Sequence, residues 1–241
     1  MTERDALFRD PSRQGPFEFN DEVAKVLPDM LARSIPGYAT LLELIGILSG
    51  HALQDGARVY DLGCSLGAVS LAVLDHSPDR SVEIIAVDSS PAMTNRLVEL
   101  LRSRSDGHRV AVRCADVLDV EINGASLVVL NFTMQFVGPE RRDELILRIA
   151  GGLAPGGALV LSEKVAPGST EEETLTLLHD EFRRNHGYSE LELARKRKAL
   201  EDVLVPDTTG EHIARMERAG LRPIEWFRGL GFVSWLATKS T

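Results

Sequence analysis

The chain has 241 residues, of which 44% are hydrophobic, and its formal net charge is −9 at pH 7. This length suits one well-filled α/β domain, which we expect to span residues 1–241. The negative charge disfavours direct binding to nucleic acid or to an anionic membrane, because both are polyanions. Two cysteines are too few for a disulfide framework, and neither they nor the histidines are spaced like metal ligands. The charged amino terminus lacks the apolar region of a signal sequence, which predicts a cytoplasmic protein that acts on a small molecule.

The N-terminal segment, residues 1–52, contains two helical patterns separated by Ile35, Pro36 and Gly37. Their sequences are DEVAKVLPDMLARS and YATLLELIGILSG. Apolar residues recur at a spacing of three and four, as in amphipathic helices. We expect these two helices to form a cap over the carboxyl ends of the strands that follow.

Five apolar runs follow the N-terminal segment, and helical patterns lie between most of them. Each run predicts a strand that is apolar on both faces, as a parallel sheet covered by helices requires. The runs are RVYDLG, VEIIAVD, RVAVRC, SLVVLN and GALVLSE, and the helical patterns are AVSLAVLDH, PAMTNRLVELLRS and ERRDELILRIAGGL. Their alternation predicts a doubly wound, mostly parallel sheet.

Two features follow the fifth run. Residues 164–206 are polar and rich in helical pattern, which predicts a helical insertion, and a further helix is expected around residues 212–219. The chain then closes with RPIEWFRG and GFVSWLATK, which meet at residues 229–231 with the character of a hairpin. A seven-stranded sheet with an antiparallel C-terminal hairpin is typical of the class I methyltransferase-like α/β fold.

The loop D-L-G-C-S-L-G, residues 61–67, follows the first strand and opens a helix. Its glycines, Gly63 and Gly67, permit a tight turn and the close approach of a ligand to the backbone. Backbone N–H groups at such a helix start face the crevice where ligands bind. The loop is one residue shorter than the dinucleotide fingerprint G-x-G-x-x-G, and it resembles the S-adenosylmethionine loop D-x-G-x-G-x-G. Ser65 stands where that loop has a further glycine.

Polar side chains end the next three strands. Asp88 is placed to accept hydrogen bonds from both ribose hydroxyls, and Asp116 from an adenine amino group, with Val117 as an apolar wall of that pocket. Each aspartate is also consistent with a helix cap, but three polar strand ends on one crevice favour a ligand site. Asn131 is followed by Phe132 instead of the Pro-Pro-aromatic motif that aligns amines, which argues against N-methylation.

Motifs along nearly the whole chain resemble the carboxy-S-adenosyl-L-methionine synthase family. In chain order they are RDALF, FNDEVAKVLPDMLARSIPGY, VYDLGCSLGA, D-S-S-P-A-M, VVLNFTMQF, PGGALVLSEK and NHGYSELELARKRKALEDVL. The resemblance implies an enzyme that converts S-adenosyl-L-methionine and prephenate to carboxy-S-adenosyl-L-methionine, phenylpyruvate and water, with no metal. It implies that the product supplies the carboxymethyl group for a tRNA wobble uridine through a separate enzyme, so this chain need not touch tRNA.

The loop, the strand ends and the resemblance together predict ten site residues. Arg197, in the context KR-x-x-LE, matches the family arginine that binds the new carboxylate, and a guanidinium suits that contact. We predict Arg197 as the catalytic residue. The resemblance implies a homodimer and leaves open which subunit supplies this arginine. The predicted cofactor-binding residues are Tyr38, Gly63, Cys64, Ser65, Asp88, Ser89, Asp116, Val117, Asn131 and Arg197.

The insertion carries other basic residues, namely Arg183, Arg184, Arg195, Lys196 and Lys198. A charge run on a helix is usually a solvated face, whereas a dianionic substrate such as prephenate requires cationic partners. Two other functions share the loop and the aspartates. One is an S-adenosylmethionine-dependent methyltransferase for a small anionic acceptor, and the other is a noncatalytic S-adenosylmethionine-binding protein. Ser65 and Arg197 favour the synthase over the first, and the polar strand ends argue against the second.

Overall fold

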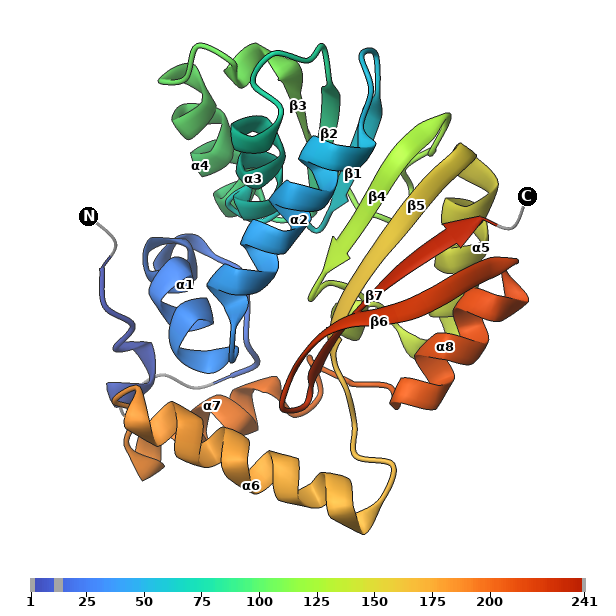
Figure 1. The fold of residues 1–241 in the computed structure, drawn as a ribbon. Coiled ribbons are helices and arrows are strands. Elements are labelled where there is room, and N and C mark those ends of the chain that lie inside the picture. Colours follow the sequence, from blue (N-terminus) through green and yellow to red (C-terminus); the bar gives the residue numbers. More distant parts are fainter. Residues whose placement is uncertain (1–2, 11–14, 240–241) are drawn as a thin grey trace.

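The computed structural model describes residues 3–10 and 15–239, so parts of the expected N-terminal cap, residues 1–2 and 11–14, lie outside the described residues. Seven strands form one sheet (Figure 1). They are β1 (Arg58–Leu62), β2 (Glu83–Asp88), β3 (Val110–Cys114), β4 (Ala125–Asn131), β5 (Leu153–Lys164), β6 (Leu221–Gly229) and β7 (Phe232–Lys239). Their order across the sheet is β3-β2-β1-β4-β5-β7-β6.

The sheet is parallel from β3 to β5, and the C-terminal hairpin changes its direction. β7 lies between β5 and β6 and runs antiparallel to both, with Leu161 opposite Trp235 in the β5–β7 ladder. The tight turn between the hairpin strands places Leu230 at a φ of +56°. The predicted fold class, a mostly parallel seven-stranded sheet with an antiparallel hairpin, is confirmed.

The described residues also form eight α-helices, several with side-chain caps. The Asn20 side chain accepts hydrogen bonds from two backbone N–H groups of the first helix, and Ser189 and Thr208 open later helices with capping boxes. The helices are α1 (Asp21–Ser34), α2 (Tyr38–Ala52), α3 (Ala68–His76), α4 (Pro91–Arg102), α5 (Arg142–Gly152), α6 (Thr170–Asn185), α7 (Glu190–Leu200) and α8 (Thr209–Arg218).

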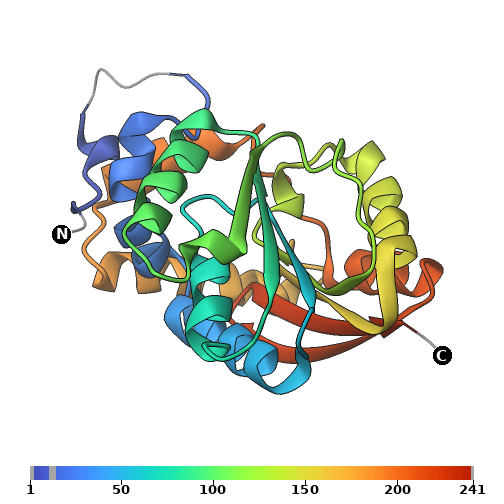
Figure 2. The same ribbon diagram turned by 90° about the horizontal axis from the view of Figure 1, so that it is seen from above.

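Helices cover both faces of the sheet (Figure 2). On one face, Leu41 and Ile45 of α2 share a buried apolar cluster with Val73 of α3 and Leu97 of α4. On the other face, side chains of α5 and α8 pack with Trp235 and other strand residues. Burial of these two clusters is the main stabilising term for such a layered domain.

Two elements differ in placement from the expectation drawn from their sequences. α2 packs along the face of the sheet, and mainly its first turns approach the strand ends, because its apolar residues continue the face covered by α3. β3 is mostly exposed or half-buried, although its sequence is apolar, because it is an edge strand and residues 115–124 form no helix over it.

The two ends of the insertion lie side by side, since Ala166 and Thr208 form a parallel bridge just after β5 and just before α8. Its helices α6 and α7 lie across the strand ends, beside α1 (Figure 1). The imidazole Nε2 of His179 on α6 lies 2.7 Å from the carbonyl oxygen of Ser34 on α1.

Among the described residues, no single helix is long and apolar enough to cross a membrane. Only α1 and α2 taken together reach that length and apolarity, and the pair is bent by 97°.

Candidate active site

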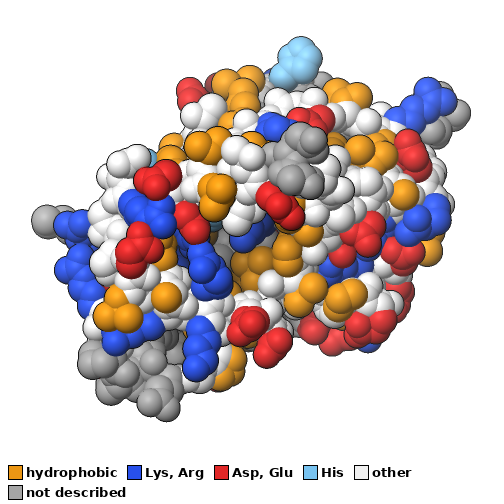
Figure 3. All heavy atoms as spheres, turned by 90° about the horizontal axis from the view of Figure 1, so that it is seen from below, with side chains coloured by type: hydrophobic (Ala, Val, Ile, Leu, Met, Phe, Trp, Pro, Cys, Tyr) orange, Lys and Arg blue, Asp and Glu red, His pale blue; other side chains and the backbone are white. Residues whose placement is uncertain are grey.

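A cavity of about 560 Å³ lies at the carboxyl ends of the parallel strands and is closed by α1, α6 and α7. Figure 3 shows the molecule from the insertion side, with hydrophobic side chains inside a hollow and lysine and arginine side chains beside it. The size is typical of small-molecule sites. Nine of the ten predicted site residues line it: Tyr38, Gly63, Cys64, Ser65, Asp88, Ser89, Asp116, Val117 and Asn131.

The loop after β1 is held by backbone hydrogen bonds. The N–H groups of Gly63 and Cys64 donate to the Val87 carbonyl oxygen at 2.8 and 2.9 Å. Gly63 has a φ of +77°, and a Cβ there would lie 2.2 Å from Oγ1 of Thr133. Ser65 has a φ of +50°, in the left-handed region that favours glycine. This backbone conformation explains why a loop of this shape commonly carries glycine at the position of Ser65.

Asp88 organises the loop as well as the strand end. Its Oδ2 accepts a hydrogen bond from the Ser65 backbone N–H at 2.9 Å, and its Oδ1 accepts one from the Ser90 N–H at 2.8 Å. The side-chain cap of α4 is Ser90, whose Oγ accepts from the Met93 N–H. Asp88 is therefore not the helix cap, and its oxygens keep acceptor capacity for a ligand. Burial raises the pKa of Asp88 above its ordinary value.

Two other carboxylates line the same end of the cavity. Oδ2 of Asp61 accepts hydrogen bonds from the backbone N–H and the hydroxyl of Ser70, at 3.0 and 2.7 Å, so it ties β1 to α3. Burial raises the pKa of Asp61 to about 6. Asp116 is exposed, and its Oδ1 accepts from the Leu118 N–H at 2.8 Å. Val117 beside it is buried.

Asn131 and the residues after it close the middle of the cavity. The Oδ1 of Asn131 is buried and accepts no hydrogen bond from any described residue, so an acceptor at the wall remains for a ligand. The ring of Phe132 lies 6.3 Å from that of Tyr38 and 5.8 Å from that of Phe232, between ring centroids. These three aromatic rings therefore form an apolar wall of the cavity between the loop after β1 and the insertion.

Glu163, at the end of β5, supports this wall from behind. Its carboxylate accepts hydrogen bonds from three successive backbone N–H groups, those of Thr133, Met134 and Gln135, at 2.7–3.1 Å. The side chain is fully buried, and burial raises the pKa of Glu163 to about 8 against the opposing effect of these donors. Glu163 was not predicted from the sequence, where an acid at the end of an otherwise apolar strand was its only signal.

The two thiols of the chain have different surroundings. Cys64 is buried in the loop. Its burial, and to a smaller extent the nearby charge of Asp61, raises the pKa of its thiol well above the ordinary range. A neutral, buried thiol is a poor nucleophile. Cys114 is exposed at the end of β3 and does not line the cavity.

Basic side chains line the insertion end of the cavity: Lys164, Arg183 and Lys196. Lys164 was not predicted from the sequence, and Arg183 and Lys196 stood out there only as members of basic runs. Arg197 does not line the cavity of this chain. Its side chain is 63% exposed and its Nη2 lies 2.8 Å from Oδ2 of Asp180.

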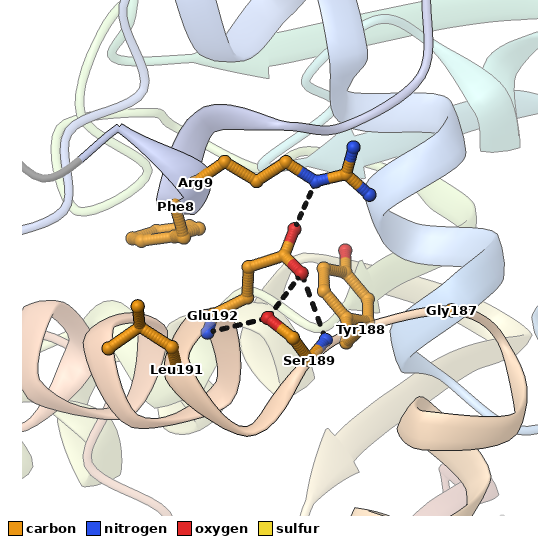
Figure 4. Close-up of a pocket in the computed structure, with 7 residues that line it drawn as sticks. All are labelled: Phe8, Arg9, Gly187, Tyr188, Ser189, Leu191 and Glu192. Atoms are coloured by element: carbon orange, nitrogen blue, oxygen red, sulfur yellow. Dashed lines mark hydrogen bonds and ion pairs between the residues drawn. The ribbon is translucent and has the colours of Figure 1, made fainter.

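A second, more open depression lies between the N-terminal segment and α7 (Figure 4). Glu192 accepts a hydrogen bond from Nε of Arg9 at 3.0 Å, and it also completes the capping box with Ser189. The carboxylate of Glu192 is thus hydrogen-bonded to residues of the same chain. These hydrogen bonds hold the start of α7 against the N-terminal segment. Among the described residues, no group of three His, Cys, Asp or Glu side chains is arranged to hold a metal ion.

Comparisons with known proteins agree with this architecture. A family model described as a methyltransferase domain matches residues 59–157. Two curated proteins named carboxy-S-adenosyl-L-methionine synthase are similar over their whole length: the one from Pseudoalteromonas atlantica is 42% identical, with 100% of both chains covered, and the one from Ectopseudomonas mendocina is 46% identical, with 98% of both covered.

Solved structures of lower sequence identity share the fold. An O-methyltransferase family protein from Burkholderia thailandensis is 20% identical with a TM-score of 0.64, covering 98% of this chain and 67% of that one. Human N-acetylserotonin methyltransferase is 16% identical with a TM-score of 0.61, covering 92% of this chain and 56% of that one.

The fold, the cavity and these relatives define a class I methyltransferase-like α/β protein, an enzyme of the transferase type. The full-length similarity is more specific than the fold. The chain belongs to the carboxy-S-adenosyl-L-methionine synthase family, as its motifs had indicated.

Proposed function

We propose that the protein converts S-adenosyl-L-methionine and prephenate to carboxy-S-adenosyl-L-methionine, phenylpyruvate and water. The observation that carries the proposal is the arrangement of nine predicted cofactor-binding residues around one cavity, in a chain of this family. The product would supply, in the cytoplasm, the carboxymethyl group that a separate enzyme places on a tRNA wobble uridine.

The cofactor assignment follows the order of the strand ends. We assign the ribose hydroxyls to Asp88, whose oxygens keep acceptor capacity, and the adenine amino group to Asp116 above Val117. The methionine portion would lie against the loop of Gly63, Cys64 and Ser65, where no Cβ fits at the first position. Ser89, Tyr38 and Asn131 would complete the wall.

The proposed reaction needs neither a protein nucleophile nor a protein base. Prephenate loses carbon dioxide and its hydroxyl as its ring becomes aromatic, and the departing hydroxide takes a proton from the sulfonium methyl group to form water. The resulting ylide attacks the carbon dioxide and forms the new carbon–carbon bond. The chain would contribute positioning, water exclusion and electrostatic stabilisation. The high pKa of the buried Cys64 thiol is in keeping with this scheme.

Arg197 is proposed to bind the new carboxylate across a homodimer interface. Its side chain is exposed and pairs with Asp180 beside the cavity of its own chain, without lining that cavity, which leaves the guanidinium accessible to a neighbouring subunit. Arg197→Leu should leave the affinity for S-adenosyl-L-methionine unchanged and abolish the preference for the carboxylated form in calorimetry. Lys198→Leu, at the exposed neighbouring position, is the matched control. Equal weakening of both ligands by Arg197→Leu would refute this role.

Product analysis tests the activity directly. The purified enzyme is incubated with S-adenosyl-L-methionine and prephenate that carries ¹³C in its ring carboxyl group, and the nucleoside product is analysed by mass spectrometry. We expect a product with the mass of S-adenosyl-L-methionine plus one labelled carbon dioxide, and none without prephenate. Formation of S-adenosylhomocysteine and a methylated acid would instead identify a methyltransferase for an anionic acceptor.

A further inference from the structure

Three basic side chains from three different elements lie at one end of the cavity. Lys164 ends β5, Arg183 lies on α6 and Lys196 lies on α7, and all three line the same hollow. We call these three residues the cation cluster. Burial and the charge of Arg183 lower the pKa values of both Lys164 and Lys196, so Arg183 lies close enough to each lysine to repel its charge.

The counter-charges of the cation cluster are incomplete. Among the described residues, the Lys164 ammonium has no hydrogen-bond or ion-pair partner, and the Nε of Arg183 is buried without an acceptor. Arg183 donates from Nη2 to Asp180, which Arg197 shares. Lys196 donates to the hydroxyls of Ser34 and Tyr188, at 2.9 and 3.3 Å, and its nearest carboxylate oxygen, on Asp5, is 3.9 Å away.

A buried excess of positive charge is costly unless an anion accompanies it. His179, beside the cation cluster, does not add to the charge, because burial and the charge of Arg183 lower its pKa to about 4, although the hydrogen bond of its Nε2 to the Ser34 carbonyl oxygen acts in the opposite direction. The carboxylates that act on the lysines of the cation cluster are Asp5, Asp29 and Asp180, and the further cations Arg33 and Arg197 lie beside them, so the cations outnumber the carboxylates. The site therefore favours a ligand group that carries more than one negative charge.

Aromatic side chains lie next to the cation cluster. The imidazole of His179 packs edge-on against Phe232 at 4.9 Å, and Phe232 in turn packs against Phe132. Both phenyl rings line the cavity. The surface beside the cations therefore suits a hydrocarbon ring, and the cations suit carboxylates attached to it.

We propose that Lys164, Arg183 and Lys196 bind the two carboxylates of a dianionic second substrate, whose ring lies against Phe132 and Phe232. This inference rests on the proposed function, for which it identifies the residues that hold the acid. Lys164 and Arg183 make direct contacts, since each has donor capacity that no described residue uses. Lys196 is held by Ser34 and Tyr188 and supplies the third charge. The methionine portion of the nucleoside has one carboxylate only, which does not match three cations.

A dead-end complex separates binding from turnover. The full-length enzyme is saturated with S-adenosylhomocysteine, which has no methyl group to react, and prephenate is titrated by calorimetry. We expect Lys164→Met and Arg183→Leu each to weaken prephenate binding by roughly 10- to 100-fold, the loss typical of a charge-assisted hydrogen bond. The affinity for S-adenosyl-L-methionine, measured alone, should change by less than about 2-fold.

Arg184→Leu is the matched control, because Arg184 is adjacent on α6, pairs with Glu181 and Glu190, and does not line the cavity. It should bind prephenate like the unmodified enzyme. The proposal fails if the unmodified complex does not bind prephenate, if Arg184→Leu weakens binding as much as Arg183→Leu, or if the cluster variants lose affinity for S-adenosyl-L-methionine equally. If prephenate binds and the cluster variants lose it, while S-adenosyl-L-methionine is never carboxylated, the anion site stands and the proposed reaction is wrong.

Discussion

The two ends of the cavity are built in different ways. At the loop end, Asp61, Gly63, Ser65 and Asp88 are held by short backbone hydrogen bonds at consecutive strand ends. At the insertion end, long basic side chains come from β5, α6 and α7. The loop end therefore depends on local backbone geometry, whereas the insertion end depends on how separate helices pack on one another.

The charges at the two ends are opposite, and burial opposes both. Burial raises the pKa values of Asp61 and Asp88 at the loop end, and it lowers those of Lys164 and Lys196 at the insertion end. The aspartates at one end and the lysines at the other are thus less easily charged than in water. A ligand group that donates hydrogen bonds to the aspartates, or an anion beside the lysines, would stabilise their charged forms. The difference predicts that variants at the two ends will affect different ligands.

The largest effect is expected from Gly63→Ala. The new Cβ would lie 2.2 Å from Thr133 Oγ1, which donates a hydrogen bond to the Leu62 carbonyl oxygen, and the φ of +77° adds strain. We expect a loss of about 2–5 kcal/mol in the free energy of unfolding, measured with urea. Gly56→Ala is the control, because Gly56 has a φ of +76° but no atom within 4 Å of the added Cβ. It should cost only about 1 kcal/mol, and equal losses would show that the loop tolerates the side chain.

The next effect is expected at Asp88. Asp88→Ala removes the acceptor for the Ser65 N–H and the proposed partner of the ribose. We expect S-adenosyl-L-methionine and carboxy-S-adenosyl-L-methionine to lose affinity alike, by about 2–3 kcal/mol in calorimetry, since the ribose is common to both. Asp119→Ala, at an exposed position outside the cavity lining, should change neither affinity. A loss confined to one of the two ligands would contradict the assignment.

Much of the loop end could be predicted because its signals are local. α1 and α3 have the bounds that their patterns indicate, and the strand-end positions follow from parallel strands that end at one edge of the sheet. The special backbone position of Ser65 is also visible in the sequence, as a departure from a glycine pattern. The structure places nine predicted residues in one cavity, and their contacts with a ligand stay predictions.

The insertion end could not be predicted in the same way. Arg183 lines the cavity and the adjacent Arg184 does not, and Lys196 lines it while Arg197 points to Asp180 outside it. These pairs look equivalent in a basic helix. Which side chain faces inward depends on the packing of α6 and α7 on α1, through contacts such as His179 with Ser34, 145 residues apart in sequence. The same holds for α2, whose apolar pattern does not tell which apolar surface it will cover.

A smaller, pH-dependent effect is expected at the insertion end. Burial and the charges of Arg183 and Arg33 lower the pKa of Lys196 to about 8, although Asp5 and Asp29 raise it. The free enzyme therefore loses this charge as the pH rises through 8, so above pH 8 the binding of a dianion is coupled to the uptake of one proton by the Lys196 amine. We expect the affinity for prephenate to fall by up to about tenfold between pH 8 and 9, in calorimetry of the complex with S-adenosylhomocysteine.

Lys196→Arg supplies the control for this titration, because a guanidinium stays charged throughout that range. Its affinity for prephenate should be nearly constant from pH 7 to 9. A variant that keeps the slope of the unmodified enzyme would assign the titration to another group, of which Lys164 is the nearest candidate with a lowered pKa.

The smallest effect is expected at Ser65, where the backbone matters more than the hydroxyl. Its N–H donates to Asp88, whereas its Oγ lies 3.4 Å from the sulfur of the fully buried Met93. Ser65→Ala keeps the N–H and the left-handed strain, and Ser65→Gly keeps the N–H and removes the strain. Both should therefore bind S-adenosyl-L-methionine within about threefold of the unmodified enzyme, and the glycine variant should be the more stable of the two by about 0.5–1 kcal/mol. An equal loss of affinity of tenfold or more in both variants would assign the hydroxyl, and not the loop backbone, to the ligand.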